Sequence, residues 1–164
     1  MSKEVEFKIK SKLFTLPKLK QQVDTWKNEG CKVVFTNGCF DLVHTGHLTY
    51  LAKAAELGDK LIIGLNADLS VKKLKGEHRP INNEQSRSLL LAAMLFTDAV
   101  VVFDEDTPHN LIKTLLPDVL VKGGDYTIDN IVGAAEVQAN GGEVKTINFV
   151  DGYSSTSIIN RIKG

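Results

Sequence analysis

The chain has 164 residues, of which 43% are hydrophobic and 24% charged, a composition typical of a globular domain with one core. Twenty basic residues balance twenty acidic ones, so no overall field attracts nucleic acid or a membrane surface. No apolar run approaches the roughly 20 residues that span a bilayer, and two cysteines, Cys31 and Cys39, make no disulfide framework. We expect a soluble cytoplasmic protein that binds any anion through a local site.

Hydrophobic periodicity predicts short buried strands that alternate with helices. The strands are expected at about residues 32–36, 61–65, 100–103, 119–121 and 144–149, and the helices at about residues 17–28, 47–57, 83–96, 107–115, 132–139 and 154–164. This alternation is typical of βαβ units and of a parallel sheet covered on both sides. We therefore predict an α/β fold with a Rossmann-like, doubly wound, five-stranded parallel sheet in the order 3-2-1-4-5.

The N-terminal part of the chain precedes this pattern. Residues 1–15 show no clear period, and Pro17 suits the first turn of a helix that Gly30 ends. We expect an extension and helix over residues 1–29, followed by a single domain over residues 30–164. Two helices of that domain are expected to turn apolar side chains inward: Leu48, Leu51, Ala52 and Ala55 in one, and Leu89, Leu90, Ala93 and Met94 in the other.

The most informative stretch runs from Phe35 to His47, where an apolar strand ends in a glycine turn and a helix begins. The first amides of a helix lack backbone partners, and the helix dipole favours an anion at that end. His44 and His47 can lie on one side of the helix start and donate to a phosphoryl oxygen. Gly46 between them permits close approach to the backbone. The stretch predicts a site for a nucleoside triphosphate.

Two other interpretations of these histidines stay open. They could be solvated side chains or helix caps without a ligand. They could also join Cys39 and Asp41 in a metal site, but four ligands would then have to fold back over a very tight loop. We favour phosphate binding and expect no metal held by protein ligands alone.

Polar clusters also follow other predicted strands, and in such folds ligands bind at the carboxyl ends of the strands. After the second strand, a basic loop gathers Lys72, Lys73, Lys75 and Arg79 within eight residues, beside Gly76. It predicts a mobile clamp over phosphate groups, with Lys75 and Arg79 as the first candidates. A solvated loop is the alternative.

Two further clusters are rich in glycine and in hydroxyl groups. They are Lys122, Gly123, Gly124 and Asp125 after the fourth strand, and Ser154, Ser155 and Thr156 at the start of the last helix. Glycines permit positive φ and close backbone approach, Lys122 could pair with a phosphate, and Asp125 could accept from a ribose hydroxyl or an adenine amine. Hydroxyls beside a helix N-terminus can surround a phosphate. A plain glycine turn and ordinary N-capping are the alternatives.

Residues 38–47, Gly-Cys-Phe-Asp-Leu-Val-His-Thr-Gly-His, resemble the GxFDxxHxGH signature of the cytidylyltransferase-like nucleotidyltransferases. These enzymes join a nucleoside triphosphate to a phosphorylated acceptor and release pyrophosphate. Residues 74–80, 105–108, 121–126 and 139–144 resemble the adenylyltransferase half of the bacterial ADP-heptose synthases, and the likeness covers about residues 30–162. The chain has no room for the sugar kinase to which that half is often fused.

The resemblance implies a stand-alone nucleotidyltransferase domain over residues 30–164. Its expected reaction transfers AMP from ATP to D-glycero-β-D-manno-heptose 1-phosphate, giving ADP-heptose for lipopolysaccharide core or a related glycan. ATP is then the co-substrate, Mg²⁺ bridges its phosphates, and a separate sugar kinase acts upstream. The partners are small molecules, with no nucleic acid and no membrane, and a homodimer is expected because relatives commonly pair.

The resemblance also assigns roles to residues. His44, His47, Lys75 and Arg79 are the expected catalytic group, in contact with phosphates. The expected nucleotide-binding residues are Asn37, Gly38, Cys39, Phe40, Asp41, Gly46, Arg87, Lys122, Gly123, Asp125, Ser154, Ser155 and Thr156. Asp41 is expected to stiffen the turn, and Phe40 fits core packing better than binding. Arg87 matches a family arginine, but a surface ion pair is an equal alternative.

One departure from the family bears on the nucleotide. Its cytidylyltransferase members carry an arginine before the hydroxyl run, whereas residues 149–152 here, Phe-Val-Asp-Gly, contain none. That argues against CTP and requires Lys122, Lys75 or Arg79 to supply the missing cation. A glycerol 3-phosphate or other polyol-phosphate cytidylyltransferase is the alternative enzyme, and a nucleotide-sensing module without turnover is the remote one.

Overall fold

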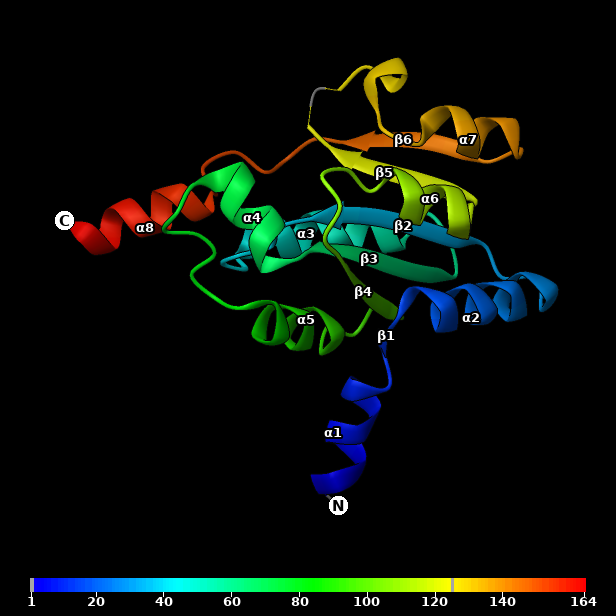
Figure 1. Cartoon of the computed structure of the whole chain (residues 1–164), viewed down its shortest axis with the longest axis horizontal. Coiled ribbons are helices and arrows are strands. Elements are labelled where there is room, and N and C mark those ends of the chain that lie inside the picture. The colour runs from blue at the N-terminus through cyan, green and yellow to red at the C-terminus, as the bar shows by residue number, and fades with distance from the viewer. Residues whose placement is uncertain (1, 125) are drawn as a thin grey trace.

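The computed structural model describes residues 2–124 and 126–164. Its helices and strands follow one another in the order α1 Ser2–Lys10, β1 Leu13–Phe14, α2 Leu16–Asn28, β2 Val33–Gly38, α3 Thr45–Ala55, β3 Lys60–Asn66, α4 Asp68–Lys75, α5 Glu84–Ala92, β4 Ala99–Phe103, α6 His109–Leu115, β5 Val119–Gly123, the 3₁₀ helix η1 Ile128–Asn130, α7 Ala134–Ala139, β6 Glu143–Ile147 and α8 Ser155–Lys163 (Figure 1). Asp125, one of the expected binding residues, lies outside the described residues.

A parallel sheet of six strands, in the order β1-β4-β3-β2-β5-β6, organises the fold. The five strands predicted from the sequence keep the predicted order 3-2-1-4-5, which is confirmed. The predicted strand count was wrong by one, because β1 adds an edge strand beside β4. Its two residues, Leu13 and Phe14, pair with Val100 and Val101. A strand of this length is too short to show the alternation that marks strands in a sequence.

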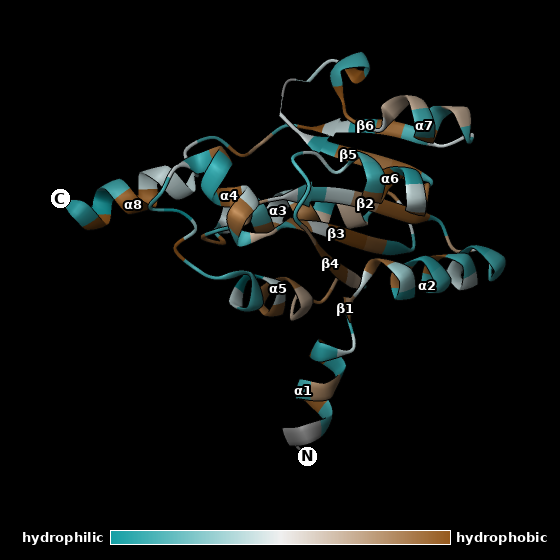
Figure 2. Cartoon of the chain, in the orientation of Figure 1, coloured by the Kyte–Doolittle hydropathy of each residue, from teal (hydrophilic) through white to brown (hydrophobic). Residues whose placement is uncertain are grey.

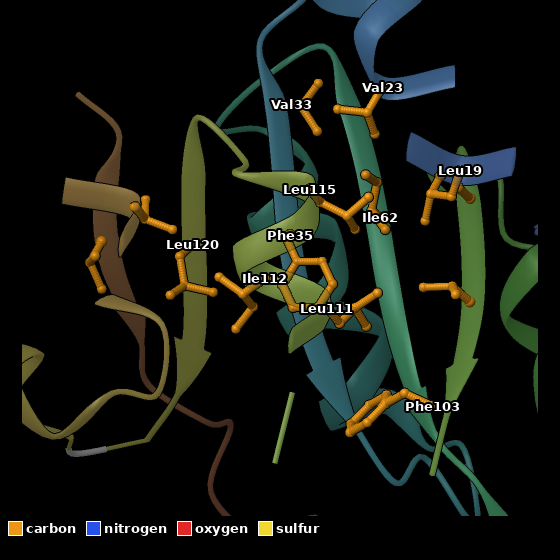
Figure 3. Packing of buried hydrophobic residues seen from close by; sticks show 14 of the residues in the cluster. Leu19, Val23, Val33, Phe35, Ile62, Phe103, Leu111, Ile112, Leu115 and Leu120 are labelled. Carbon is orange, nitrogen blue, oxygen red and sulfur yellow. The ribbon is translucent and has the colours of Figure 1, made fainter. Parts of the chain in front are cut away.

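Helices cover both faces of the sheet, as the apolar strands predict. Successive residues of β2 alternate between two cores: Val33 and Phe35 join one cluster, and Val34 joins the other. The first cluster receives α2, α6 and α7, and Figure 3 shows its packing around Phe35. The second receives α3 and α5. In Figure 2 the strands are the most hydrophobic parts of the ribbon. Helix α2, assigned to the N-terminal extension, thus contributes to the first core.

The inward faces of two helices differ from those predicted. Leu48 of α3 is exposed. In α5, Leu89 and Leu90 are exposed, and the buried residues are Arg87, Ser88, Leu91 and Ala92. The apolar pattern alone misplaces this face because a fully buried arginine occupies part of it.

The predicted basic loop is partly helical, which corrects a further expectation. Lys72, Lys73 and Lys75 belong to the last turns of α4, and Gly76 ends that helix with a φ of 103°. Cations near the C-terminus of a helix interact favourably with its dipole. The three lysines therefore project from the end of a helix instead of a loop.

Two helices extend from the body of the molecule. Helix α1 lies near the N-terminus, and α8 extends off the edge where the carboxyl ends of the strands lie (Figure 1). Helix α8 contains no buried residue. None of the described helices combines the length and the apolar character needed to cross a bilayer.

Candidate active site

The turn between β2 and α3 places the two motif histidines on one side of a helix start. Strand β2 ends at Gly38, and His44 is the N-cap of α3. The Nδ1 atom of His44 accepts from the backbone N–H of His47 at 3.4 Å. The two imidazole rings are stacked, with centroids 3.8 Å apart and planes 21° apart. Capping and stacking together fix both rings beside the free amides of the helix.

Burial keeps both histidines neutral. It lowers the pKa of His44 and, together with the adjacent His44, lowers the pKa of His47 to about 4. Nδ1 of His47 is buried and has no hydrogen-bond partner among the described residues. At neutral pH the pair therefore acts through imidazole N–H groups, which can donate to a phosphoryl oxygen without carrying a charge.

Two glycines of this turn make room for aromatic side chains. A Cβ added at Gly38 would approach Cε2 of Phe40 to 2.9 Å, and one added at Gly46 would meet the His44 ring at 3.0 Å. Phe40 is buried at a φ of 43°, and its ring meets that of His47 edge-on at 5.2 Å. The space beside the backbone that Gly46 leaves open is thus occupied by the ring of His44. Phe40 packs in the core, as favoured from the sequence.

A buried carboxylate ties the turn to the segment after α4. Asp41 accepts hydrogen bonds from the backbone amides of Ile81 at 2.7 Å and Asn82 at 3.0 Å, and from Nε of Arg79. Burial alone would raise the pKa of Asp41, but the Asn82 and Ile81 amides and the Arg79 guanidinium outweigh it and lower this pKa. Asp41 therefore stiffens the turn and also fixes Arg79 beside it.

Arg87 is enclosed by the fold and forms an ion pair at its outer end. Its side chain is 0% exposed, and its Nη2 lies 2.7 Å from a carboxylate oxygen of Asp68, whose side chain is 39% exposed. Its Nη1 donates to the carbonyl oxygens of Cys39 at 2.7 Å and Asn66 at 2.8 Å, and its Nε donates to that of Asn82. Because the guanidinium is enclosed, direct contact with a nucleotide would require this part of the fold to open. Arg87 acts on the site by holding the turn backbone.

Lys75 is the cation of the basic segment that lies free beside the histidines. The other three have carboxylate partners: Lys72 with Glu77, Lys73 with Asp106 and Arg79 with Asp41. Lys75 has no such partner within 4 Å in the described part of the chain. After burial and His44, its charge is a further cause of the lowered pKa of His47. The charge of Lys75 therefore acts on the inner histidine of the motif.

The end of β5 contributes a second cation. Nζ of Lys122 lies 3.5 Å from Oδ1 of Asn37, at the end of the neighbouring strand β2. Burial lowers the pKa of Lys122, and burial also raises the pKa of the Cys39 thiol nearby. Gly124 has a φ of 97°, a backbone conformation that favours glycine. The adjacency of β2 and β5 brings Asn37 and Lys122 together.

The hydroxyl run at the start of α8 is partly engaged within the protein. Ser154 is the N-cap and accepts from the amide of Ser157 at 3.0 Å. Ser155 donates to the carbonyl oxygen of Leu42 at 3.3 Å and so docks α8 on the motif turn. Thr156 faces a cavity of about 400 Å³ whose other lining residues are His78, Arg79, Ile81, Ile159 and Lys163. Capping and docking thus account for two of the three hydroxyls.

Comparison with known proteins agrees with the motif. Residues 35–161 match the model of the cytidylyltransferase-like family. The chain belongs to this family. It is 54% identical over 151 residues to the bifunctional protein HldE of Haemophilus ducreyi. The matched region covers 92% of this chain and 32% of that relative. It is 58% identical over 135 residues to HldE of Campylobacter fetus, covering 82% and 29% of the two chains.

The chain therefore spans about a third of the length of these curated relatives. A solved structure is similar as well: the lipopolysaccharide core biosynthesis protein from Thermoplasma volcanium, with a TM-score of 0.58 and 25% identity, over 76% of this chain and 100% of that one. As a cytidylyltransferase-like protein, the chain is a nucleotidyltransferase with a Rossmann-like fold.

Some residues near this nucleotidyltransferase site were missed from the sequence. Tyr153 stacks beside His44, with ring centroids 6.3 Å apart, and His78 and Lys163 face the same cavity as Arg79. The signal for Tyr153 was its place directly before the hydroxyl run. Lys163 lies on the same face of α8 as Thr156, but only the position of the helix reveals the cavity.

The site does not provide a carboxylate cage for Mg²⁺. The described residues contain no group of three or more His, Cys, Asp or Glu side chains arranged to hold a metal ion, and Asp41 uses both oxygens for Arg79 and the 81–82 amides. In the proposed reaction Mg²⁺ is part of the substrate MgATP.

Proposed function

We propose that the chain transfers AMP from ATP to D-glycero-β-D-manno-heptose 1-phosphate and releases pyrophosphate. The observation that carries this is the stacked pair of neutral histidines at the open start of α3, with Lys75 beside it. The segments that resemble the ADP-heptose synthases, and a structural relative titled a lipopolysaccharide core biosynthesis protein, support the heptose acceptor. The product would supply lipopolysaccharide core or a related glycan.

The mechanism is direct attack by a sugar phosphate oxygen on the α-phosphorus of ATP. The bond between that oxygen and the α-phosphorus forms as the bond to the pyrophosphate oxygen breaks, and pyrophosphate leaves with the electron pair. The attacking phosphate is already an anion, so the reaction needs no general base and no covalent enzyme intermediate. Catalysis then consists of positioning and stabilisation of charge in the transition state.

The arrangement of donors matches that demand. His44, His47 and the first amides of α3 donate to the phosphoryl oxygens at the point of transfer. Lys75 and Lys122 approach the same turn from α4 and β5. Arg79, fixed by Asp41, and Thr156 of α8 border the adjacent cavity and interact with the β- and γ-phosphates. Lys75, Lys122 and Arg79 together supply the positive charge that an arginine before Ser154 provides in the cytidylyltransferase members of the family.

The wider setting is part of the same proposal. The enzyme works in the cytoplasm on small molecules, and a sugar kinase prepares its acceptor. A homodimer is expected. Light scattering after size-exclusion chromatography measures the oligomeric state.

Pyrophosphate release tests the substrates. The purified chain is assayed with MgATP or MgCTP against heptose 1-phosphate or glycerol 3-phosphate. The proposal predicts release with ATP and the heptose alone among the four combinations. CTP-dependent release with glycerol phosphate would identify a polyol-phosphate cytidylyltransferase instead, and ATP binding without release would indicate a sensing module.

A further inference from the structure

Exposed aromatic side chains gather around the site. Among the described residues, the aromatic side chains more than a third exposed are Phe7, Tyr126, Phe149 and Tyr153. Phe7 belongs to α1, whereas the other three follow β5 and β6, from whose ends the chain leads to η1 and α8 (Figure 1). Aromatic rings carry a large apolar surface and bind flat ligands by stacking. This clustering points to a flat part of the substrate.

Phe149 is held from one side and open on the other. A Cβ added at Gly123 would come within 2.4 Å of Cζ and 2.5 Å of Cε1 of Phe149, so the ring lies directly on the end of β5. The ring of Tyr50, from α3, is 5.6 Å away and tilted by 45°. Despite these contacts Phe149 remains 56% exposed. The absence of a side chain at Gly123 is what allows the ring to rest there.

Tyr126 borders the same place. A Cβ added at Gly124 would lie 3.3 Å from Cε2 of Phe149 and 3.7 Å from Cε2 of Tyr126, so both rings adjoin one glycine. Nζ of Lys122 lies 5.8 Å from the centre of the Tyr126 ring and 3.5 Å from Oδ1 of Asn37. The two aromatic rings thus adjoin the Lys122 end of the proposed phosphate-binding surface, where the nucleoside end of a bound triphosphate would extend.

We infer that Phe149, supported by Gly123 and bordered by Tyr126, is the platform on which the base of the nucleotide stacks. This inference rests on the proposed function for the identity of the ligand. A purine offers a larger face to the ring than a pyrimidine, so Phe149 favours ATP over CTP. The platform makes the β6–α8 connection a determinant of nucleotide specificity, in the part of the sequence where the family arginine is absent.

Binding measurements with and without a base test the platform. Dissociation constants are measured by calorimetry for ATP, CTP and inorganic tripolyphosphate with the full chain and with Phe149→Leu and Phe149→Trp. Stacking predicts about tenfold weaker ATP binding for Phe149→Leu, a smaller loss for CTP and no change for tripolyphosphate. Phe149→Trp, which keeps a flat ring, retains ATP affinity, and Phe7→Leu, on α1, is the matched control.

Other results would contradict the inference, or the proposed function on which it rests. Equal losses for ATP and tripolyphosphate in Phe149→Leu would make Phe149 a structural support, and unchanged ATP affinity would remove it from the site. If Phe149→Leu does not fold, weak ATP binding by a folded Phe149→Trp variant would overturn stacking. A wild-type chain that binds ATP but does not act on heptose 1-phosphate would contradict only the proposed function, while a chain that binds neither nucleotide would overturn both.

Discussion

At the scale of single residues, the site depends on uncharged donors at its centre and cations at its rim. His44 and His47 are stacked and partly buried, and burial keeps the pKa of each below its usual value. Two imidazolium rings 3.8 Å apart would repel each other, whereas two neutral rings can each donate one N–H group. Lys75 and Lys122 supply positive charge from neighbouring elements.

Removing the inner histidine should slow turnover strongly. His47→Ala is expected to lower kcat about 100-fold, because the loss of one preorganised transition-state donor costs about that much. The assay is pyrophosphate release at saturating substrates. The control is His109→Ala, which removes an exposed histidine paired with Glu136 and should leave kcat within about twofold. A loss of less than tenfold in His47→Ala would assign His47 to structure.

The lowered pKa of His47 predicts a dependence of stability on pH. Its pKa is about 4 in the folded chain against an ordinary 6.5, so between these values the unfolded chain binds more protons. The free energy of unfolding should therefore fall as the pH drops from 6.5 towards 4. The pKa of Asp41 is also lowered, from an ordinary 3.8, so Asp41 changes the free energy of unfolding at a pH below this window.

Urea unfolding at two pH values, one near neutrality and one near pH 5, checks this in the wild type and in His47→Asn. The variant lacks the titrating group and should lose less stability on acidification. An equal loss in both proteins would show that His47 titrates normally.

At the scale of elements, long-range polar contacts hold the motif turn. Asp41 joins it to the segment before α5, Arg87 joins it to β3 and α5, and Ser155 joins it to α8. Each contact connects a side chain with backbone that is distant in sequence. The geometry of the histidines therefore depends on elements that lie far from the motif in sequence.

Breaking the Asp41 contact should destabilise the fold. Asp41→Asn leaves Arg79, whose side chain is only 13% exposed, without its carboxylate, and removing one partner of a buried pair costs about 3 kcal/mol. The measurement is the free energy of unfolding in urea. Asp106→Asn, which breaks the exposed pair with Lys73, is the matched control and should stay within about 0.5 kcal/mol. Equal effects in the two variants would contradict the role of Asp41.

These contacts also mark the limit of what the sequence could predict. The continuous apolar runs of β2 and β3 identify buried strands, and the strand that leads into the histidine motif locates the site. The pairing of Asp41 with Arg79 has no periodic signature, because the two residues come from separate loops. The inward face of α5 was mispredicted for a related reason: hydropathy assigns an arginine to the surface, while Arg87 is buried by its hydrogen bonds to backbone carbonyls.

At the scale of the whole molecule, strand order creates the site. Strands β2, β3 and β5 are neighbours in the sheet, so the loops that follow them meet at one edge although they are far apart in sequence. The crossover rules for βαβ units predict this arrangement from the alternation of strands and helices alone. They do not predict the position of α8, which buries no residue and is docked on the motif turn by the hydrogen bond from Ser155 to the carbonyl oxygen of Leu42.

We propose that this edge of the sheet transfers AMP to a sugar phosphate. The most direct test is ³¹P NMR of the purified chain incubated with MgATP and D-glycero-β-D-manno-heptose 1-phosphate. We expect the signals of ATP and of the phosphomonoester to disappear together, and pyrophosphate and a sugar-linked diphosphate to appear in equal amounts. Unchanged ATP and heptose signals, or consumption of ATP that does not depend on the heptose phosphate, would contradict it.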